Sequence, residues 1–440
     1  MPEEKKSLNK IGLWMATALV VGNMIGSGVF MLPSSLANIG GISIVGWLIS
    51  GAGAILLALL FSRLSKLVPK RGGPYQYPKE GFGEFIGFMS GWGYWASVVL
   101  TNAAIAMVFA GYFLVFFPDW SDSKIAPVVI GLGAIWLLTW INSRGVKAGG
   151  TMQLVTTILK IIPLIVLAIA GLFFFNIDNF SPMNRTGESD WVAIGAAVSL
   201  TLFAFLGIES ATVPSADEVH NAKKTIPRAT ILGTVLTILI YLISSISIFG
   251  VMPLEELGQS SAPMADAAFI IWGEGGRTLI AIGALVSTFG ALNGWILIQG
   301  QMPLAMAEDK MFPSIFKRLS KRKFPVAGIV VSSLLISVVV LANQSKGLVE
   351  LFKLLILLST FLVLISYLFS SMAEVLILIK KKDSGWKRKL VPAFLISIPT
   401  FAFSLLAIYG SGLEIVFYGF IALMLGTPFY VWSKIQQSRK

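Results

Sequence analysis

Residues 20–28 read VVGNMIGSG and lie in the middle of the first long apolar run of the chain, residues 11–37. The three glycines and the serine in this stretch are poor helix formers, so they predict a break at residues 26–28 of a membrane-crossing helix. Irregular backbone at bilayer depth is tolerated only where it is buried in protein or lines a wet cavity. A second such stretch, LGIES at 206–210, lies in the sixth apolar run and carries Glu209. Two broken helices in corresponding halves predict the substrate site of a secondary transporter.

The composition is that of a membrane protein. Of 440 residues, 55% are hydrophobic and only 13% are charged, which is too apolar for a soluble chain of this length. The net charge of +12 does not indicate a nucleic-acid partner, because the basic residues gather in short loops between apolar runs. With no cysteine and one histidine, disulfides and cysteine or multi-histidine metal sites are excluded. No cofactor is expected, and no phosphate-loop motif supports nucleotide-driven pumping.

The apolar runs predict an all-α integral membrane fold, since a span needs about 20 apolar residues. Lysine and arginine favour cytoplasmic loops, and their distribution places both termini in the cytoplasm. Twelve transmembrane helices are predicted, at residues 11–37, 42–66, 86–117, 128–142, 154–175, 192–215, 231–251, 278–300, 326–342, 351–379, 391–409 and 414–432.

The positions of the two breaks predict an internal repeat. They fall in spans one and six, which are five spans apart, so the second unit is inserted with the opposite orientation. The predicted units are residues 1–175 with spans one to five and residues 176–379 with spans six to ten. Residues 380–440 add the last two spans and a cytoplasmic tail.

Three motifs resemble those of a known superfamily. They are GNMIGSGVFMLP at 22–33, LFAFLGIESA at 202–211 with PRAT at 227–230, and GALNGWILIQGQ at 290–301. They are similar to motifs of the amino acid–polyamine–organocation superfamily, most of all its basic amino acid and polyamine antiporters, such as the bacterial arginine/agmatine and putrescine/ornithine exchangers. The resemblance implies the five-plus-five inverted-repeat (LeuT-like) fold with two extra helices. It also implies sodium-independent amino acid transport, by exchange or proton coupling, in the bacterial cytoplasmic membrane, and it allows a homodimer.

The carboxylate of an amino acid needs hydrogen-bond donors. The exposed amides of Ser27 and Gly28 provide them at the start of a half-helix, where the helix dipole favours an anion by about 0.3–1 kcal/mol. The resemblance places the carboxylate at the turn formed by Gly26, Ser27 and Gly28. Glycines that serve only close helix packing are the alternative.

The amino group of the substrate needs acceptors. The last carbonyls of a helix have no partner within that helix. We therefore expect acceptors where the first half-helices of spans one and six end, around Asn23, Ile25, Phe203 and Leu206. Both sets of carbonyls would point toward the same cavity.

Two ionisable residues lie inside predicted spans and are functional candidates by default. Glu209 is predicted to carry a proton, to act as a gate or to recognise a cationic side chain; a structural carboxylate in the unwound turn is the alternative. Lys160 needs partners or must lose its proton. The basic antiporters are apolar at this position, whereas a lysine resembles proton-coupled and neutral amino acid exchangers, where it replaces a sodium ion against span one. Its predicted role is a tether or a gating or proton-coupling group, with Tyr241 as a neighbour.

Aromatic residues near the breaks are expected to close over the substrate. Trp295 matches a family tryptophan that forms a floor beneath the substrate, and Phe203 stands where the basic antiporters carry tryptophan. A ring without the indole donor weakens cation–π stacking on an amine. Aromatic side chains in spans otherwise serve packing or the interfacial belt. The resemblance also assigns pocket and gate positions to Tyr94, Asn102, Ser359 and Tyr367, and a cytoplasmic gate position to Tyr75.

The sequence supports two substrate classes equally. Glu209, Trp295 and the motifs favour a basic amino acid or polyamine, while Phe203 and Lys160 favour a neutral amino acid. Three other kinds of protein fit less well. An enzyme would need a metal or acid–base cluster, and a channel would need a pore lined by repeated polar residues. A nutrient receptor on a transporter fold would bind without flux.

Overall fold

The fold is a bundle of long apolar helices. The computed structural model describes residues 11–70, 72–120, 123–144, 150–209, 219–320, 325–382 and 385–438. Within these ranges nine helices are long and apolar enough to cross a membrane, and three shorter apolar helices coincide with predicted spans five, six and nine. A helix pairs its backbone groups internally, which is why apolar sequence in lipid adopts this form.

Short connections join the helices, and one isolated β-bridge links Ile11 to Val219. Short 3-10 helices lie in several connections, including η1 (Gly73–Tyr75). In chain order the α-helices are α2 (Leu13–Met24), α3 (Ser27–Ala37), α4 (Ser43–Leu67), α5 (Gln76–Phe82), α6 (Glu84–Leu114), α7 (Ala126–Ser143), α8 (Gly150–Gly171), α9 (Asp190–Phe203), α10 (Ala222–Val251), α11 (Leu254–Gln259), α12 (Pro263–Glu308), α13 (Val326–Ala342), α14 (Leu348–Lys381), α15 (Trp386–Gly410), α16 (Leu413–Met424) and α17 (Gly426–Ser438).

Each predicted span overlaps at least one of these helices, but several differ in extent. Helix α10 begins at Ala222 rather than at residue 231, and α12 extends well beyond 278–300 in both directions, with a bend at Gly273 (φ 67°). The predicted run 414–432 forms two helices, α16 and α17, that meet at Leu425. A count of apolar residues finds only the part of a helix that lies in lipid. The helical hydrogen bonds continue beyond that part, so the helix is longer than the apolar run.

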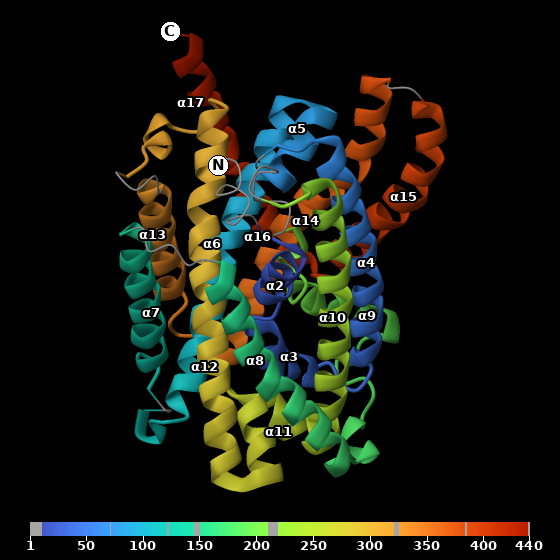
Figure 1. Ribbon diagram of the computed structural model, residues 1–440. Helices are drawn as coiled ribbons and strands as arrows, with labels where there is room; N and C mark the ends of the chain where they lie inside the picture. Colours follow the sequence, from blue (N-terminus) through green and yellow to red (C-terminus); the bar gives the residue numbers. More distant parts are fainter. Residues whose placement is uncertain are drawn as a thin grey trace, which may run out of the picture.

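The helices pack in two groups. Helix α10 packs against α2 and α4, and α4 packs against α9; in the second group α6, α7, α12 and α13 pack on one another. Helix α8 lies between the groups through contacts with α2, α10 and α12, and α14 through contacts with α6, α4 and α9. Helices α5 and α17 lie at one end of the molecule and α11 at the other (Figure 1).

The first span consists of two helices. Helix α2 ends at Met24 and α3 begins at Ser27, with Ile25 (φ −75°, ψ 89°) and Gly26 (φ −131°, ψ −124°) between them. The break thus starts one residue before the predicted 26–28, and Ser27 and Gly28 form the first turn of α3.

The sixth apolar run also leaves the helical conformation. Helix α9 ends at Phe203, and turns follow through Gly207, whose φ of 105° suits glycine. Helical structure therefore ends before the predicted break at 207–209, and residues 210–215 of this predicted span lie outside the described residues. A Cβ on Gly207 would lie 3.2 Å from the Cβ of Asn23, so the two irregular stretches are in contact.

Candidate functional site

A small cavity lies between the two irregular stretches. Its volume is about 10 Å³, which is room for about one water molecule. Helices α6 and α12 complete the wall. The lining residues are Asn23, Met24, Gly26, Ser27, Gly28, Thr101, Ile105, Phe203, Ala204, Leu206 and Trp295.

Four residues predicted to bind substrate do not line this cavity. Ile25 and Glu209 are fully buried beside it, and Asn102 donates to Gln299 Oε1 at 2.7 Å. Ser359 lies behind the wall, with its hydroxyl 2.7 Å from that of Thr101. In this arrangement the four residues lie outside the cavity wall, and the side-chain oxygen of Asn102 is buried without a hydrogen-bond partner among the described residues. Their role in substrate binding stays a prediction.

Sequence reasoning missed two wall residues on α6, Thr101 and Ile105. A signal was present. Tyr94 and Asn102 were already candidates, and residues 94, 98, 101 and 105 follow the spacing of one helix face. A polar residue on that face of a span near the breaks was therefore a candidate as well.

The start of α3 presents donors to the cavity. Ser27 is 2% exposed, and its hydroxyl has no hydrogen-bond partner among the described residues. The first amides of a helix have no partner within that helix. Gly28 also has a packing role, because a Cβ there would lie 2.9 Å from the Cβ of Ala204. The turn thus combines close packing with free donors at the cavity.

The carbonyls at the end of α2 are already bound by side chains. Lys160 Nζ donates to the carbonyls of Gly22 and Ile25, the latter at 2.7 Å. The Tyr241 hydroxyl lies 2.5 Å from the Met24 carbonyl and 3.0 Å from that of Ala204. A carbonyl has two lone pairs, so each of these carbonyls keeps acceptor capacity beside its side-chain donor. The role of the Ile25 carbonyl in binding a substrate amino group stays a prediction.

Lys160 and Tyr241 therefore hold the irregular stretches in place. Lys160 is 2% exposed and joins α8 to the end of α2, while Tyr241 joins α10 to both breaks. The carbonyl of Asn23 has a long contact, 3.4 Å, with Trp295 Nε1. The turn after α9, from Phe203 to Leu206, is the second expected source of acceptors. There the Phe203 carbonyl accepts from the Leu206 amide at 3.1 Å, and the Ala204 carbonyl contacts the Tyr241 hydroxyl.

Glu209 and two predicted gate residues form one buried cluster. The Tyr94 hydroxyl donates to Glu209 Oε1 at 2.6 Å, and the Tyr367 hydroxyl donates to Oε2 at 2.7 Å. Tyr94 lies on α6 and Tyr367 on α14, so the carboxylate connects the turn after α9 to both helices. The sequence separated these residues by more than a hundred positions, and the fold brings them together.

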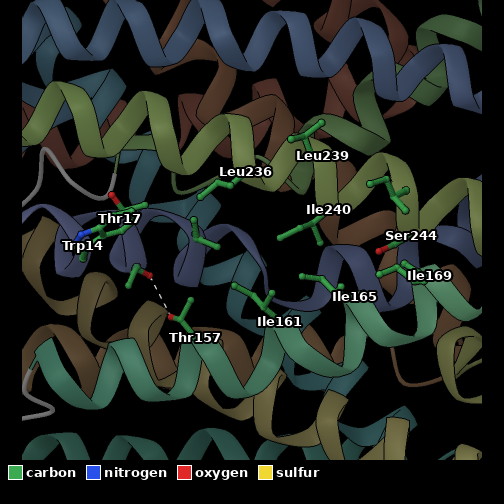
Figure 2. A pocket seen from close by; sticks show the side chains of 14 residues that line it. Trp14, Thr17, Thr157, Ile161, Ile165, Ile169, Leu236, Leu239, Ile240 and Ser244 are labelled. Carbon is green, nitrogen blue, oxygen red and sulfur yellow. Dashed lines mark hydrogen bonds between the residues drawn. The ribbon is translucent and has the colours of Figure 1, made fainter.

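A larger hollow lies elsewhere and has a different character. It is a groove of about 550 Å³ between α2, α8 and α10. Figure 2 shows its lining of mainly apolar side chains, including Ile161, Ile165, Leu236, Leu239 and Ile240. It offers almost no polar group to a zwitterion, so size alone does not identify the site.

Tyr75 lies in a separate cluster at the end of α12. Asp309 Oδ2 accepts hydrogen bonds from Lys79 Nζ at 2.6 Å, Tyr75 at 2.8 Å and Gln76 Nε2 at 3.0 Å. Burial alone would raise the pKa of Asp309, but these three hydrogen bonds outweigh it and hold the pKa below its usual value. The cluster joins the connection between α4 and α6 to α12. The sequence did not single out Asp309, because sequence alone does not distinguish a hydrogen-bonded acidic residue in a loop from one that is only solvated.

Replacing Asp309 by asparagine is expected to lower the free energy of unfolding by about 1 kcal/mol, since the pair with Lys79 is partly exposed and screened. A carboxylate with a lowered pKa stabilises the fold above its unfolded pKa of about 3.9 and loses that effect as the pH falls further. The difference from wild type should thus be constant from about pH 8 to pH 5 and shrink below about pH 4. Thermal unfolding in detergent measures it.

A matched control is Glu350→Gln, which removes an exposed pair with Lys346 (2.8 Å) and should change stability by less than about 0.5 kcal/mol. Equal stability of the wild type and Asp309→Asn at pH 7 would contradict a stabilising cluster at this end.

Comparison with known proteins identifies the family of the chain. The family model described as amino acid permease matches residues 11–432. The chain is 33% identical over 430 residues to the putrescine transporter PotE of Haemophilus influenzae, covering 96% of each chain. It is also 33% identical to a putative arginine/ornithine antiporter of Bacillus subtilis (84% and 85% covered) and to a cadaverine/lysine antiporter of Escherichia coli (78% and 77% covered). This chain therefore belongs to the amino acid permease family of the amino acid–polyamine–organocation superfamily and is an integral membrane protein.

Proposed function

We propose that this chain is a sodium-independent secondary transporter of amino acids or related amines. The family and the relatives are transporters rather than enzymes. The observation that carries the proposal is the meeting of two irregular stretches at one buried cavity, with the first turn of α3 facing it. Broken helices at a midplane cavity are how many transporters bind a small charged substrate.

The substrate's carboxylate binds the amides of Ser27 and Gly28 at the start of α3. Its amino group lies toward the carbonyls where α2 and α9 end, since each of these carbonyls can accept a second hydrogen bond. Phe203 and Trp295 close the cavity, which here holds no more than about one water. Substrate entry therefore requires these side chains or the half-helices to move.

Alternating access follows from the packing. The group α2, α4, α9 and α10 rocks against the group α6, α7, α12 and α13, with the cavity between them. We further propose that residues 1–175 and 176–379 are two inverted units and residues 380–440 add helices, with twelve crossings and both termini in the bacterial cytoplasm. Transport proceeds by exchange or with proton coupling.

Glu209 acts as the proton-sensitive element of the gate formed with Tyr94 and Tyr367. Glu209→Gln keeps the size of the side chain but cannot take up a proton. We expect the pH dependence of transport to become flat in this variant, whereas the wild-type rate changes with pH. Uptake into proteoliposomes between pH 5 and pH 8 measures the effect.

The control is Glu374→Gln. Glu374 is also buried, but it lies toward the C-terminal end of α14 and pairs with Arg63 at 2.5 Å. Its pH profile should match the wild type. An unchanged profile in Glu209→Gln would instead assign Glu209 a structural role.

Transport in proteoliposomes tests the proposed function. Radiolabelled alanine, serine, arginine and putrescine are offered with and without internal substrate, with and without a pH gradient, and with sodium or potassium outside. We expect saturable uptake that needs internal substrate or a pH gradient and is indifferent to sodium. Flux without saturation would identify a channel, and tight binding without flux a receptor; either result would contradict the proposal.

A further inference from the structure

We propose that Thr101 presents a hydrogen-bond acceptor to the bound substrate and thereby selects side chains that end in a donor, a hydroxyl or an ammonium. The inference rests on the proposed function of the same cavity. It concerns the substrate's side chain, which neither the start of α3 nor the turn after α9 addresses.

Thr101 occupies the part of the wall that a side chain would meet. It is 2% exposed and lines the cavity from α6 together with Ile105. With the carboxylate at Ser27 and Gly28, the remaining wall from α6 and α12 consists of Thr101, Ile105 and Trp295. Thr101 is the only residue of these three whose side chain carries an oxygen atom.

Three contacts behind the wall fix the direction of the Thr101 hydroxyl. The Ser359 hydroxyl is 3.0 Å from the carbonyl of Ser97, 3.0 Å from the Ser97 hydroxyl and 2.7 Å from the Thr101 hydroxyl. A hydroxyl has one proton and two lone pairs, while a carbonyl can only accept. All three contacts are hydrogen bonds only if Ser359 donates to the carbonyl and accepts from both other hydroxyls.

The proton of Thr101 is therefore committed to Ser359, and its oxygen has lone pairs but no proton for the cavity. A substrate hydroxyl or ammonium gains a hydrogen bond there, whereas a methyl group gains none and a carboxylate is repelled. No carboxylate lines the described part of the cavity wall, so an ammonium gains this hydrogen bond without an ion pair. One ordinary hydrogen bond corresponds to about a three- to tenfold preference.

Pairs of substrates with nearly the same shape test the inference. Serine and 2-aminobutyrate differ by a hydroxyl against a methyl, and ornithine and norleucine by an ammonium against a methyl. Each competes for uptake of a labelled substrate by wild-type protein in proteoliposomes. We expect the donor-bearing member to compete about three to ten times better in at least one pair.

Thr101→Val keeps the shape of the wall but removes the oxygen. The preference should fall to about onefold, with the affinity for the methyl-bearing member unchanged within about twofold. Thr101→Ser retains the hydroxyl and should retain the preference. Ser97→Ala is the matched control: it removes the other donor to Ser359 but does not touch the cavity, so the preference should persist.

If Thr101→Val loses the preference for serine over 2-aminobutyrate, the recognised donor is a hydroxyl. If it loses the preference for ornithine over norleucine, the donor is an ammonium. Either result supports the inference. It is overturned if the wild type prefers neither donor-bearing member, or if Thr101→Val retains the wild-type preference. The absence of any amino acid or amine uptake by wild type would overturn the proposed function itself and this inference with it.

Discussion

Replacing Lys160 by methionine is expected to slow exchange at least about tenfold. Lys160 Nζ donates to the carbonyls of Gly22 and Ile25, and both lie at the end of α2. A buried acceptor without a partner costs about 1–3 kcal/mol, and 1.4 kcal/mol corresponds to a factor of ten. Methionine fills similar space without a donor, so the end of α2 loses its two hydrogen bonds to α8. Because the end of α2 borders the cavity, the balance between the outward-facing and inward-facing conformations should then shift toward one of the two.

Exchange rates in proteoliposomes, together with the accessibility of a reporter cysteine in the otherwise cysteine-free chain, measure both effects. Thr157→Val is the matched control on the same face of α8. Its hydroxyl contacts the Ala18 carbonyl at 3.3 Å, a weaker bond between neutral groups, and its loss should alter exchange by less than about threefold. Wild-type kinetics in Lys160→Met would show that the lysine contributes nothing to the transport cycle.

Much of the fold could be predicted because apolar runs and helix breakers act locally. The stretch at residues 20–28 predicted a break, and the structure has one at Ile25 and Gly26. Helix bounds were predicted less well at α10 and α12, where polar residues continue the helix beyond the apolar run.

The contacts around the site could not be predicted from local sequence. Lys160 was expected to need partners, but the sequence could not show that one of them is the carbonyl of Ile25. The choice of acceptor depends on distances between helices far apart in the chain. The direction of the Thr101 hydroxyl likewise depends on Ser359, which lies on α14.

Glu209 was a candidate because it is an ionisable residue inside a span, and Tyr94 and Tyr367 were candidates because of the family resemblance. The structure groups the three, since each tyrosine donates to a different oxygen of one carboxylate. The family resemblance offered no comparable pointer for Asp309, whose partners lie on η1 and α5.

The central claim is that the first turn of α3 binds the substrate's carboxylate, and Ser27→Pro addresses it with little harm to the fold. Ser27 is the first residue of α3, a position where proline is favoured because its missing amide has no helical partner. The preceding Gly26 has ψ −124° and must shift toward the extended region that proline imposes on its neighbour, a change that glycine permits. The variant therefore removes one donor while the helix remains.

Hydrogen bonds to charged groups contribute about 1.5–3 kcal/mol, so Ser27→Pro should weaken amino acid binding by about ten- to a hundredfold. Ser27→Ala is the control, because it removes the hydroxyl and keeps the amide. The most direct measurement is calorimetric binding of a transported amino acid to wild type, Ser27→Ala and Ser27→Pro. The account predicts that the proline variant loses far more affinity than the alanine variant; wild-type affinity in Ser27→Pro, with the fold intact by thermal unfolding, would contradict it.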